Sequence, residues 1–182
     1  MLGMEIRRLN FLSTSGKQEF VGIDFSSNTL KIAHAKGLPN KRKIVNLLSR
    51  DITGLPDAEI SKVIRACFNN LALKDLNIIN TVPTHLILTK NIELPSIDHE
   101  EIKKIIDLQV PRHTPYSREE IISDYIDLCT YKHTYTKILL VIVARNVIKR
   151  QFEILEKAGL KLGSVLLAPE GIARSISRIL KI

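Results

Sequence analysis

An aspartate, a small polar turn and a lysine stand close together near the beginning of this chain. Asp24 ends an apolar run, residues 26–28 supply hydroxyl and amide side chains, and Lys31 lies in the run that follows. A tight turn of this kind points several backbone N–H groups at one spot, which suits a phosphate, and a carboxylate can hold a hydrated Mg²⁺ beside it. The predicted phosphate site consists of Asp24, Ser26, Ser27, Asn28 and Lys31.

The same residue types also occur in ordinary β-hairpins, so a plain turn remains the alternative interpretation. Val21 and Ile23 fit one strand, and Leu30 and Ile32 fit a strand that returns beside it. Asn and Ser favour turns because their side chains bond to the local backbone. The sequence therefore predicts a hairpin in either case and leaves its chemical role open.

Other residues that could do chemistry are dispersed along the chain. The five histidines occur singly, without a cysteine or carboxylate at a known metal-ligand spacing. Cys67 and Cys129 have no CxxC partner, and we expect both to be small buried apolar residues in a reducing compartment. No residue resembles an activated nucleophile, and no pair of carboxylates indicates general acid and base catalysis.

Composition and charge favour an ordinary globular protein with acidic partners. The chain has 182 residues, of which 45% are hydrophobic and 25% charged, with a net charge of +8 and a pI near 9.6. Aromatic residues make up only 5%, and there is no RNP-like or KH-like motif, so we do not expect nucleic-acid binding. No apolar run approaches the ~20 residues of a membrane span, and the N-terminus lacks a secretory signal pattern, which predicts a cytoplasmic location.

The first part of the chain reads as a compact α/β unit. After the hairpin, Lys43–Asp51 is a third strand, within which Asn46–Leu48 is expected to lie on the core face. A helix begins at Pro56 and runs to about Leu71, and residues 77–82 form a short buried strand. Three meandering strands, a crossover helix and a fourth strand are therefore expected.

The second part has its own pattern after Pro83. It reads as a strand, a helix, two strands, a helix and a last strand, at residues 86–94, 97–110, 121–131, 137–144, 147–158 and 160–167. This β-α-β-β-α-β order is that of a ferredoxin-like unit. Ser117 and Glu120 form a predicted helix-start cap, and residues 169–182 form a final amphipathic helix.

The order of these motifs resembles a known family. GID, a small-residue turn and SxxLK are followed by TVPxxxxxxxxIELP, IISDYIDL, LLVIVAR, LEKAGL and APEGIARSI. The run resembles the N-terminal half of the PilM family of actin-like cytoplasmic proteins of type IV pilus assembly. It is more distantly similar to the FtsA group and to the cytoplasmic domain of GspL of type II secretion.

The resemblance implies an α/β fold that is the N-terminal half of an actin-like ATPase. Residues 1–18 would be a flexible N-terminus, 19–83 subdomain IA, and 84–168 an inserted ferredoxin-like (SHS2-type) subdomain. Residues 169–182 would be a helix that packs back on IA or on a missing second half. In this family the first hairpin binds the phosphates of ATP, so Asp24 would lie by Mg²⁺ and Lys31 by the same anion.

The resemblance also implies partners and a location. Relatives of this kind bind the cytoplasmic N-terminal peptide of the inner-membrane protein PilN, so the first hypothesis is a scaffold that is peripheral at the inner membrane through such a partner. The alternatives are an ATP-binding switch that needs a missing C-terminal half, and a structural adaptor that forms homo-oligomers. Ser26 stands where the family turn usually has glycine, which allows the closest backbone approach to a phosphate. Because the resemblance also implies that the second half of the nucleotide site is missing, we expect at most weak ATPase activity.

Overall fold

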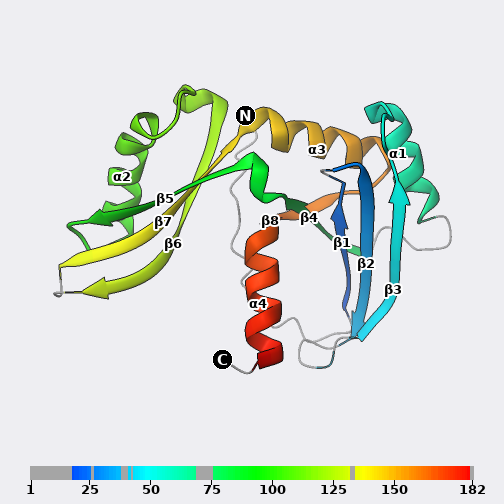
Figure 1. Ribbon diagram of the computed structural model, residues 1–182, viewed down its shortest axis with the longest axis horizontal. Coiled ribbons are helices and arrows are strands. Elements are labelled where there is room, and N and C mark those ends of the chain that lie inside the picture. The colour runs from blue at the N-terminus through cyan, green and yellow to red at the C-terminus, as the bar shows by residue number, and fades with distance from the viewer. Residues whose placement is uncertain are drawn as a thin grey trace. The chain divides into compact units, whose positions relative to one another are not determined.

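The structure is a computed structural model, and it describes residues 18–25, 27–37, 41, 43–68, 76–131 and 134–180. The chain divides into two compact units (Figure 1). Residues 84–148 form the three-stranded unit, and the described residues before 84 and after 148 form the five-stranded unit.

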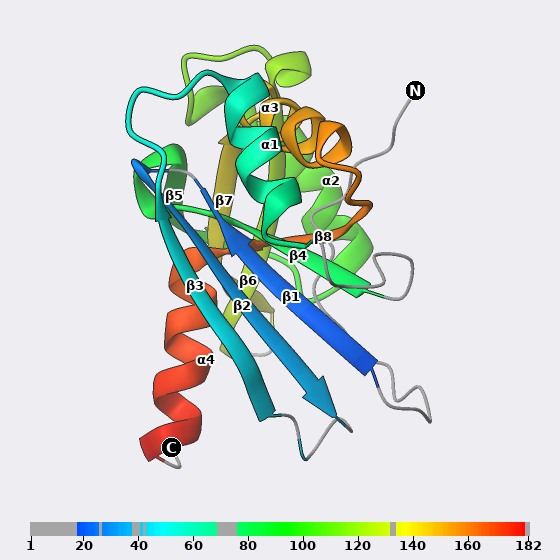
Figure 2. The ribbon, with the colours of Figure 1, turned by 90° about the vertical axis from the view of Figure 1, so that its right-hand side faces the viewer.

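The five-stranded unit is a mixed sheet in the order β3-β2-β1-β4-β8. Strands β1, β2 and β3 form an antiparallel meander, while β4 and β8 run parallel to β1 and extend the sheet on its other side. Figure 2 shows the meander with β3 outermost. The strand bounds are β1 Gln18–Asp24, β2 Thr29–Gly37, β3 Lys43–Asp51, β4 Leu76–Val82 and β8 Leu162–Leu167.

One face of this sheet is covered by helices α1 (Asp57–Ala66) and α3 (Arg145–Lys157), the latter from Lys149 onward. Alternate strand residues point to this face because side chains alternate along a strand. The core there includes Ile23, Leu30 and Ile78 from the sheet, together with Ile64 and Leu155 from the two helices. We call this side of the sheet the covered face.

Helix α1 forms where the sequence predicts it. Asp57 and Glu59 lie in its first turn, where negative charge complements the helix dipole. Ile60 and Ile64, four residues apart, both face the core. The helix ends at Ala66 and a turn follows at Cys67 and Phe68, so it is shorter than predicted, while residues 69–71 of the predicted extension lie outside the described residues.

The three-stranded unit has the antiparallel order β5-β7-β6, with one long helix, α2, packed on it. Leu94, Ile102, Ile106 and Leu140 are buried between this sheet and the helix. Its elements are η2 Thr84–Leu86, β5 Ile87–Leu94, α2 His99–Gln109, η3 Val110–Arg112, η4 Arg118–Glu120, β6 Ile121–Tyr131 and β7 Tyr135–Ala144.

Local capping explains where the helical segments of this unit begin. The Glu101 backbone N–H donates to Asp98 Oδ1 at 2.9 Å, which caps α2. The predicted cap at Ser117 is confirmed, because its backbone N–H and its hydroxyl both donate to Glu120 Oε2, at 2.9 and 2.8 Å. It opens the short 3-10 turn η4 rather than a long helix.

The last predicted strand belongs to the other sheet. Residues of β8 pair in parallel with β4, from Ile78 with Leu162 to Val82 with Leu167, so β8 is an edge of the five-stranded sheet. The ferredoxin-like order β-α-β-β-α-β is therefore corrected to β-α-β-β within residues 84–148, and the boundary predicted at 168 falls at Ile148. Chain order alone could not reveal this, because β8 returns across the insertion to a strand that precedes it.

Two predicted burials are also wrong. Within Asn46–Leu48, Leu47 is 68% exposed and only Leu48 packs partly against the core, because β3 is an edge strand that no helix covers on its other face. Cys129 is exposed in β6, whereas Cys67 is half-buried and its burial raises the pKa of the thiol.

Helix α4 (Ala168–Leu180) lies by β8 on the side of the sheet opposite to α1 and α3. None of its described residues is buried, although Ile172, Ile176 and Ile179 form an apolar stripe. Glu170 and Arg174 pair along the helix at 2.6 Å. The predicted amphipathic helix is therefore present, but its apolar stripe remains largely exposed.

Candidate functional site

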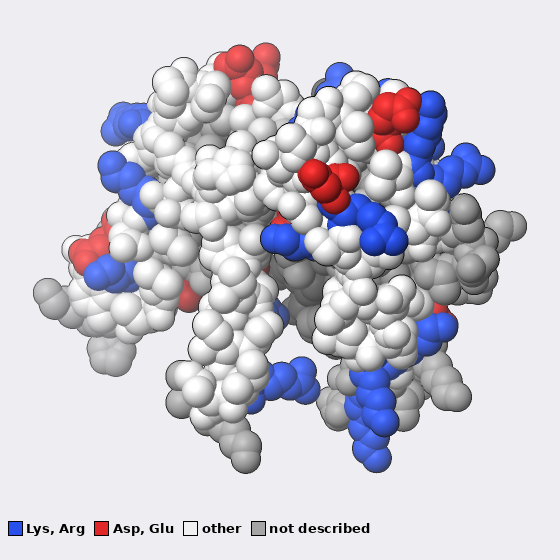
Figure 3. Space-filling model, turned by 45° about the vertical axis from the view of Figure 1, so that its right-hand side comes forward, with Lys and Arg blue, Asp and Glu red and all other residues white. Residues whose placement is uncertain are grey.

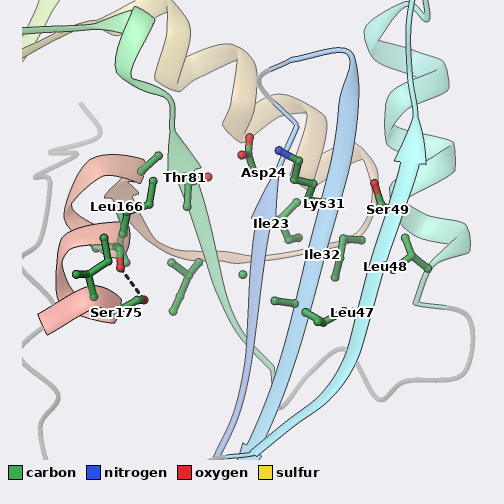
Figure 4. A pocket seen from close by; sticks show the side chains of 17 residues that line it. Ile23, Asp24, Lys31, Ile32, Leu47, Leu48, Ser49, Thr81, Leu166 and Ser175 are labelled. Carbon is green, nitrogen blue, oxygen red and sulfur yellow. Dashed lines mark hydrogen bonds between the residues drawn. The ribbon is translucent and has the colours of Figure 1, made fainter. Parts of the chain in front are cut away.

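Asp24 and Lys31 are direct neighbours across the first hairpin. The register pairs Asp24, at the end of β1, with Lys31 in β2. Their charged groups point toward one another in Figure 4. Ser27 and Asn28 form the exposed turn between the strands, and Ser26 lies outside the described residues. The structure therefore brings together the carboxylate and the ammonium group of the predicted phosphate site, while their role in binding stays a prediction.

Phe25 fixes the orientation of this turn. It directly follows Asp24, and its side chain is only 3% exposed within the core of the covered face. Since neighbouring strand residues point to opposite sides, this anchor places Asp24 on the other face. The backbone N–H of Ile52 also donates to the Asn28 carbonyl at 2.8 Å, which ties the turn to the end of β3. Sequence reasoning missed the anchor, although an aromatic residue directly after Asp24 is its signal.

The face that carries Asp24 is hollowed by a trough of about 820 Å³ between the sheet and α4. We call this side of the sheet the open face and the hollow the open-face trough. Gly22 and Ala33 are adjacent in the register and line the trough from β1 and β2, while Leu47 lines it from β3. Ile172 and Ile176 line it from α4.

Most polar side chains of the open-face trough lie near the strand ends, and Ser175 lines it from α4. Asp24, Lys31, Ser49 and Thr81 lie together at one end of the group of labelled residues in Figure 4. The remaining lining is mostly aliphatic, and its larger side chains are far from buried: Leu47 is 68% and Ile172 61% exposed. The site therefore offers an apolar channel with one charged pair at its end, which suits an apolar segment or an anion held beside it.

Ion pairs occur at two other places in this unit: between α1 and α3, and at the start of β1. Arg150 in α3 donates from Nε and Nη2 to Asp57 at the start of α1, with a shortest distance of 2.7 Å, and this hydrogen bonding lowers the pKa of Asp57. Near the start of β1, the Glu19 carboxylate lies 2.7 Å from Lys36 Nζ and 2.9 Å from His34 Nε2. The bond from Lys36 is the largest cause that lowers the pKa of Glu19.

Positive charge is concentrated in the part of the chain that forms the five-stranded sheet. Residues 84–148 carry eight Lys and Arg and nine Asp and Glu, whereas the rest of the chain carries nineteen and ten. On the face drawn in Figure 3, basic side chains occur at several separate places with acidic ones between them. This arrangement differs from a single basic patch, and the absence of nucleic-acid binding stays a prediction.

A small pocket in the three-stranded unit is another place where titratable side chains meet. It has a volume of about 170 Å³ and is lined by His99, Asp127 and Thr136, and His99 Nδ1 lies 3.8 Å from Asp127 Oδ2. Across the described residues, no three His, Cys, Asp or Glu side chains are grouped so that they could hold a metal ion. Among these residues, too, no helix is long and apolar enough to cross a membrane.

The sequence of the chain matches the profile of a known family. The profile of the family described as type IV pilus assembly protein PilM matches residues 22–179, which is most of the chain. The chain belongs to the PilM family. The match begins at Gly22, next to the predicted phosphate hairpin, and extends almost to the end of α4. No curated protein sequence matches the chain.

Solved structures show the same fold in proteins of pilus assembly and secretion. The structure titled PilM-PilN type IV pilus biogenesis complex superposes on this PilM-family chain with a TM-score of 0.71 at 16% identity, over 82% of this chain and 47% of that one. The cytoplasmic domain of EpsL, an inner-membrane component of the type II secretion system of Vibrio cholerae, matches with a TM-score of 0.57 at 10% identity, over 82% and 57%.

These matches confirm the predicted α/β, PilM-like fold class. This chain spans about half the length of the solved relatives that it matches. Its similarity to a PilM from a complex with PilN is a similarity of fold.

Proposed function

We propose that this PilM-family protein is a scaffold of type IV pilus or type II secretion assembly that binds the cytoplasmic peptide of an inner-membrane, PilN-like partner. Such a partner would hold it at the cytoplasmic side of the inner membrane. The family match over residues 22–179, together with the fold shared with a PilM from a PilM-PilN complex, is the observation that carries the proposal.

The open-face trough is the surface that we assign to the peptide. It lies within one unit, its volume of about 820 Å³ can take several aliphatic side chains, and its exposed Leu47, Ile172 and Ile176 gain from losing contact with water. A peptide that binds there would place apolar residues over Gly22 and Ala33, where small side chains let a backbone approach closely. The charged pair at its end would fix the register of a polar or charged peptide residue.

Isothermal titration of the full chain with the N-terminal cytoplasmic peptide of the PilN-like protein tests this assignment. We expect saturable binding that Ile172→Asp weakens at least tenfold, because a carboxylate would be desolvated in the trough. Ile97→Asp is the matched control: Ile97 is 55% exposed in the three-stranded unit and its replacement should leave the affinity unchanged.

The two outcomes against it have different meanings. Equal affinity of Ile172→Asp and the unmodified chain would refute the trough as the binding surface. A complete lack of binding by the unmodified chain would refute the peptide-binding function of this chain as such.

A second candidate function, an ATP-binding switch, is favoured by the position of Asp24 opposite Lys31. The hairpin fits the phosphate part of Mg-ATP: Asp24 can hold a hydrated Mg²⁺, and Lys31 and the turn that includes Ser27 and Asn28 face the same end of the sheet. The hairpin would supply only one side of a nucleotide site. We therefore expect ATP to bind weakly unless another segment completes the site.

Titration of the chain with a fluorescent ATP analogue and Mg²⁺ tests the switch. Asp24→Ala should abolish the Mg²⁺ dependence of whatever affinity is measured, and Lys31→Gln should weaken binding of the nucleotide both with and without Mg²⁺. If Asp24→Ala and the unmodified chain bind alike, the hairpin is a plain turn. Lys41→Gln, a change of the same charge elsewhere, is the control.

A further inference from the structure

The small pocket of the three-stranded unit contains two buried polar atoms that are free to bond to a ligand. Thr136 is only 3% exposed, and neither its Oγ1 nor Asp127 Oδ1 has a hydrogen-bond partner among the described residues. Both residues line the pocket, whose volume is about 170 Å³. Buried polar groups are nearly always hydrogen-bonded, because an unpaired one costs free energy. The two oxygens are therefore placed to bond to a group that enters the pocket.

A β-bulge in β6 brings the polar side chains of the pocket to one side of the sheet. The pairing with β7 shifts after Asp127, so Leu128 is an extra residue in β6. Asp127 pairs with Ile138, and Thr130 pairs with Thr136. Since the two β7 residues are two positions apart, they point to the same face, and their β6 partners do so as well. Without the bulge the two β6 residues, three positions apart, would lie on opposite faces.

The carboxylate of Asp127 determines the charge of the ligand. His99 Nδ1 lies 3.8 Å from Oδ2 of this carboxylate and 3.1 Å from the hydroxyl oxygen of Tyr125, while Oδ1 is the buried, unbonded oxygen. A negatively charged group would be repelled here. A cationic N–H group can donate to Asp127 Oδ1 and to Thr136 Oγ1 together, and a charged donor makes the stronger bond.

Aliphatic side chains line much of the rest of the pocket. Ile97 is 55% and Leu128 48% exposed, and the buried Ile102 also lines the pocket. A carbon chain attached to the cation would cover the two exposed side chains and remove their apolar surface from water. The volume of the pocket equals that of roughly five water molecules at about 30 Å³ each, which leaves room for a short alkyl chain beside the charged group.

The geometry favours an ammonium group over a guanidinium group. A guanidinium makes its best pair with a carboxylate by bonding to both oxygens, and in Asp127 only Oδ1 is buried and unbonded. An ammonium group has three donors and acts as a point charge. Asp127 Oδ1 and Thr136 Oγ1 can accept two of its bonds, and the Thr130 hydroxyl on the same face can accept the third.

We infer that this pocket binds a primary ammonium group on a short alkyl chain, supplied either by a lysine side chain of a partner protein or by a free alkylamine. Asp127 provides the charge and one hydrogen bond, Thr136 provides a second, and Ile97 and Leu128 cover the chain. The pocket lies within residues 84–148, so the inference is independent of peptide binding in the open-face trough.

Titration of the isotope-labelled full chain with n-butylammonium chloride at constant ionic strength, followed by NMR, tests the site. We expect saturable shifts of the backbone amide signals around Asp127 and Thr136. Asp127→Asn should weaken binding at least tenfold, because it removes the charge and keeps the shape, and Thr136→Val should weaken it severalfold. The matched controls Glu119→Gln and Thr89→Val, at exposed positions of the same unit, should leave the affinity unchanged.

Three further ligands sharpen the assignment. Butanol has the same chain without the charge, and n-butylguanidinium has the same chain with a planar cation, so both should bind more weakly than n-butylammonium. A lysine derivative that is capped at its amino and carboxyl groups distinguishes the two sources. Tighter binding of this derivative than of n-butylammonium would assign the pocket to a protein side chain, and weaker binding would assign it to a free amine.

Three results would overturn the inference. The first is a lack of saturable shifts at these amides up to tens of millimolar n-butylammonium. The second is equal affinity of Asp127→Asn and the unmodified chain, with the amide spectrum of the variant showing that it is folded. The third is butanol binding as tightly as n-butylammonium, which would make the pocket a purely apolar one.

Discussion

The two faces of the five-stranded sheet are made by the same strands but have opposite character. On the covered face, Val21, Ile23, Leu30 and Ile78 are almost completely buried beneath α1 and α3. On the open face, the alternate residues of β1 and β2 are small or polar, namely Gly22, Asp24, Lys31 and Ala33, and the larger Leu47 and Ile79 come from β3 and β4. One face therefore contributes most of the stability, and the other is free to carry a binding surface.

The difference follows from strand periodicity. Successive side chains of a strand point to opposite faces, so every second residue lies on the same side. The bulky β-branched residues share one side, where they pack at the density of a core. The open side retains the apolar stripe of α4 without burying any described residue of that helix. We therefore expect substitutions on the two faces to differ in their effect on stability, and four predictions test this contrast.

The largest contrast is between isoleucines on the two sides. Ile64 of α1 is fully buried on the covered face, so Ile64→Ala should lower the free energy of unfolding by about 2–5 kcal/mol through lost burial and a cavity. Ile172→Ala beside the open-face trough should change it by no more than about 0.5 kcal/mol. Urea denaturation of the two variants measures both, and equal losses would mean that α4 is part of the stabilising core.

A buried polar pair on the covered face gives the next effect. Asn80 Nδ2 donates to Gln151 Oε1 at 2.7 Å, and both residues are buried. Gln151→Leu leaves the Asn80 amide without this acceptor and should cost about 1–3 kcal/mol. The double variant Asn80→Leu/Gln151→Leu should recover part of that loss in the same denaturation experiment. Ser175→Ala, at an exposed position of α4, is the control.

The ion pair between α1 and α3 should give a smaller, pH-dependent effect. Arg150 lowers the pKa of Asp57 from its ordinary 3.8, so the pair stabilises the fold above that pH and the contribution disappears as the pH falls through the lowered pKa. Arg150→Gln should cost up to about 1 kcal/mol at pH 7, because both side chains are partly solvated, and should cost less near pH 2, where more of the Asp57 carboxyl is protonated.

Denaturation at both pH values in low salt measures this difference. Arg65→Gln is the control. Arg65 lies in the last turn of α1, the helix that begins with Asp57, and it is not paired with a carboxylate of α3. A loss on Arg150→Gln that is equal at the two pH values would attribute the effect to packing of the arginine stem instead of its charge.

The smallest effect on stability should come from Lys31 on the open face. It is exposed and lies opposite Asp24, so Lys31→Gln should change the free energy of unfolding by less than about 0.5 kcal/mol. A thermal melt measures this. A loss of several kcal/mol would show that the charged pair is a structural element of the hairpin, which would remove the contrast between the faces at this position.

Much of the local structure of both units could be predicted from the sequence because its signals are local. The hairpin, β3, α1 and the capping residues Ser117 and Glu120 follow from short-range periodicity and turn chemistry. The pairing of β8 with β4 depends on contact between residues far apart in the chain, which no local pattern encodes. Likewise, the exposure of Leu47 depends on which strand lies at the edge.

The candidate site was predicted in part for the same reason. Asp24 and Lys31 were found because they flank one turn, and the register places them opposite each other. The open-face trough was missed because its lining comes from five strands and α4, whose mutual arrangement emerges only in the folded sheet. Its signal in the sequence was the alternation of small residues at 22 and 33 with large ones beside them.

The return of β8 across the insertion affects the order of events during synthesis. Ile78 pairs with Leu162, so the fifth strand is added only after the whole of residues 84–148 has been translated. Until then β4 pairs only with β1 and its other side is an open edge, and closing a loop of this length slows the addition of β8. The nascent chain should therefore pass through a four-stranded intermediate, and a ribosome stalled before Leu162 would present that species for capture by a chaperone.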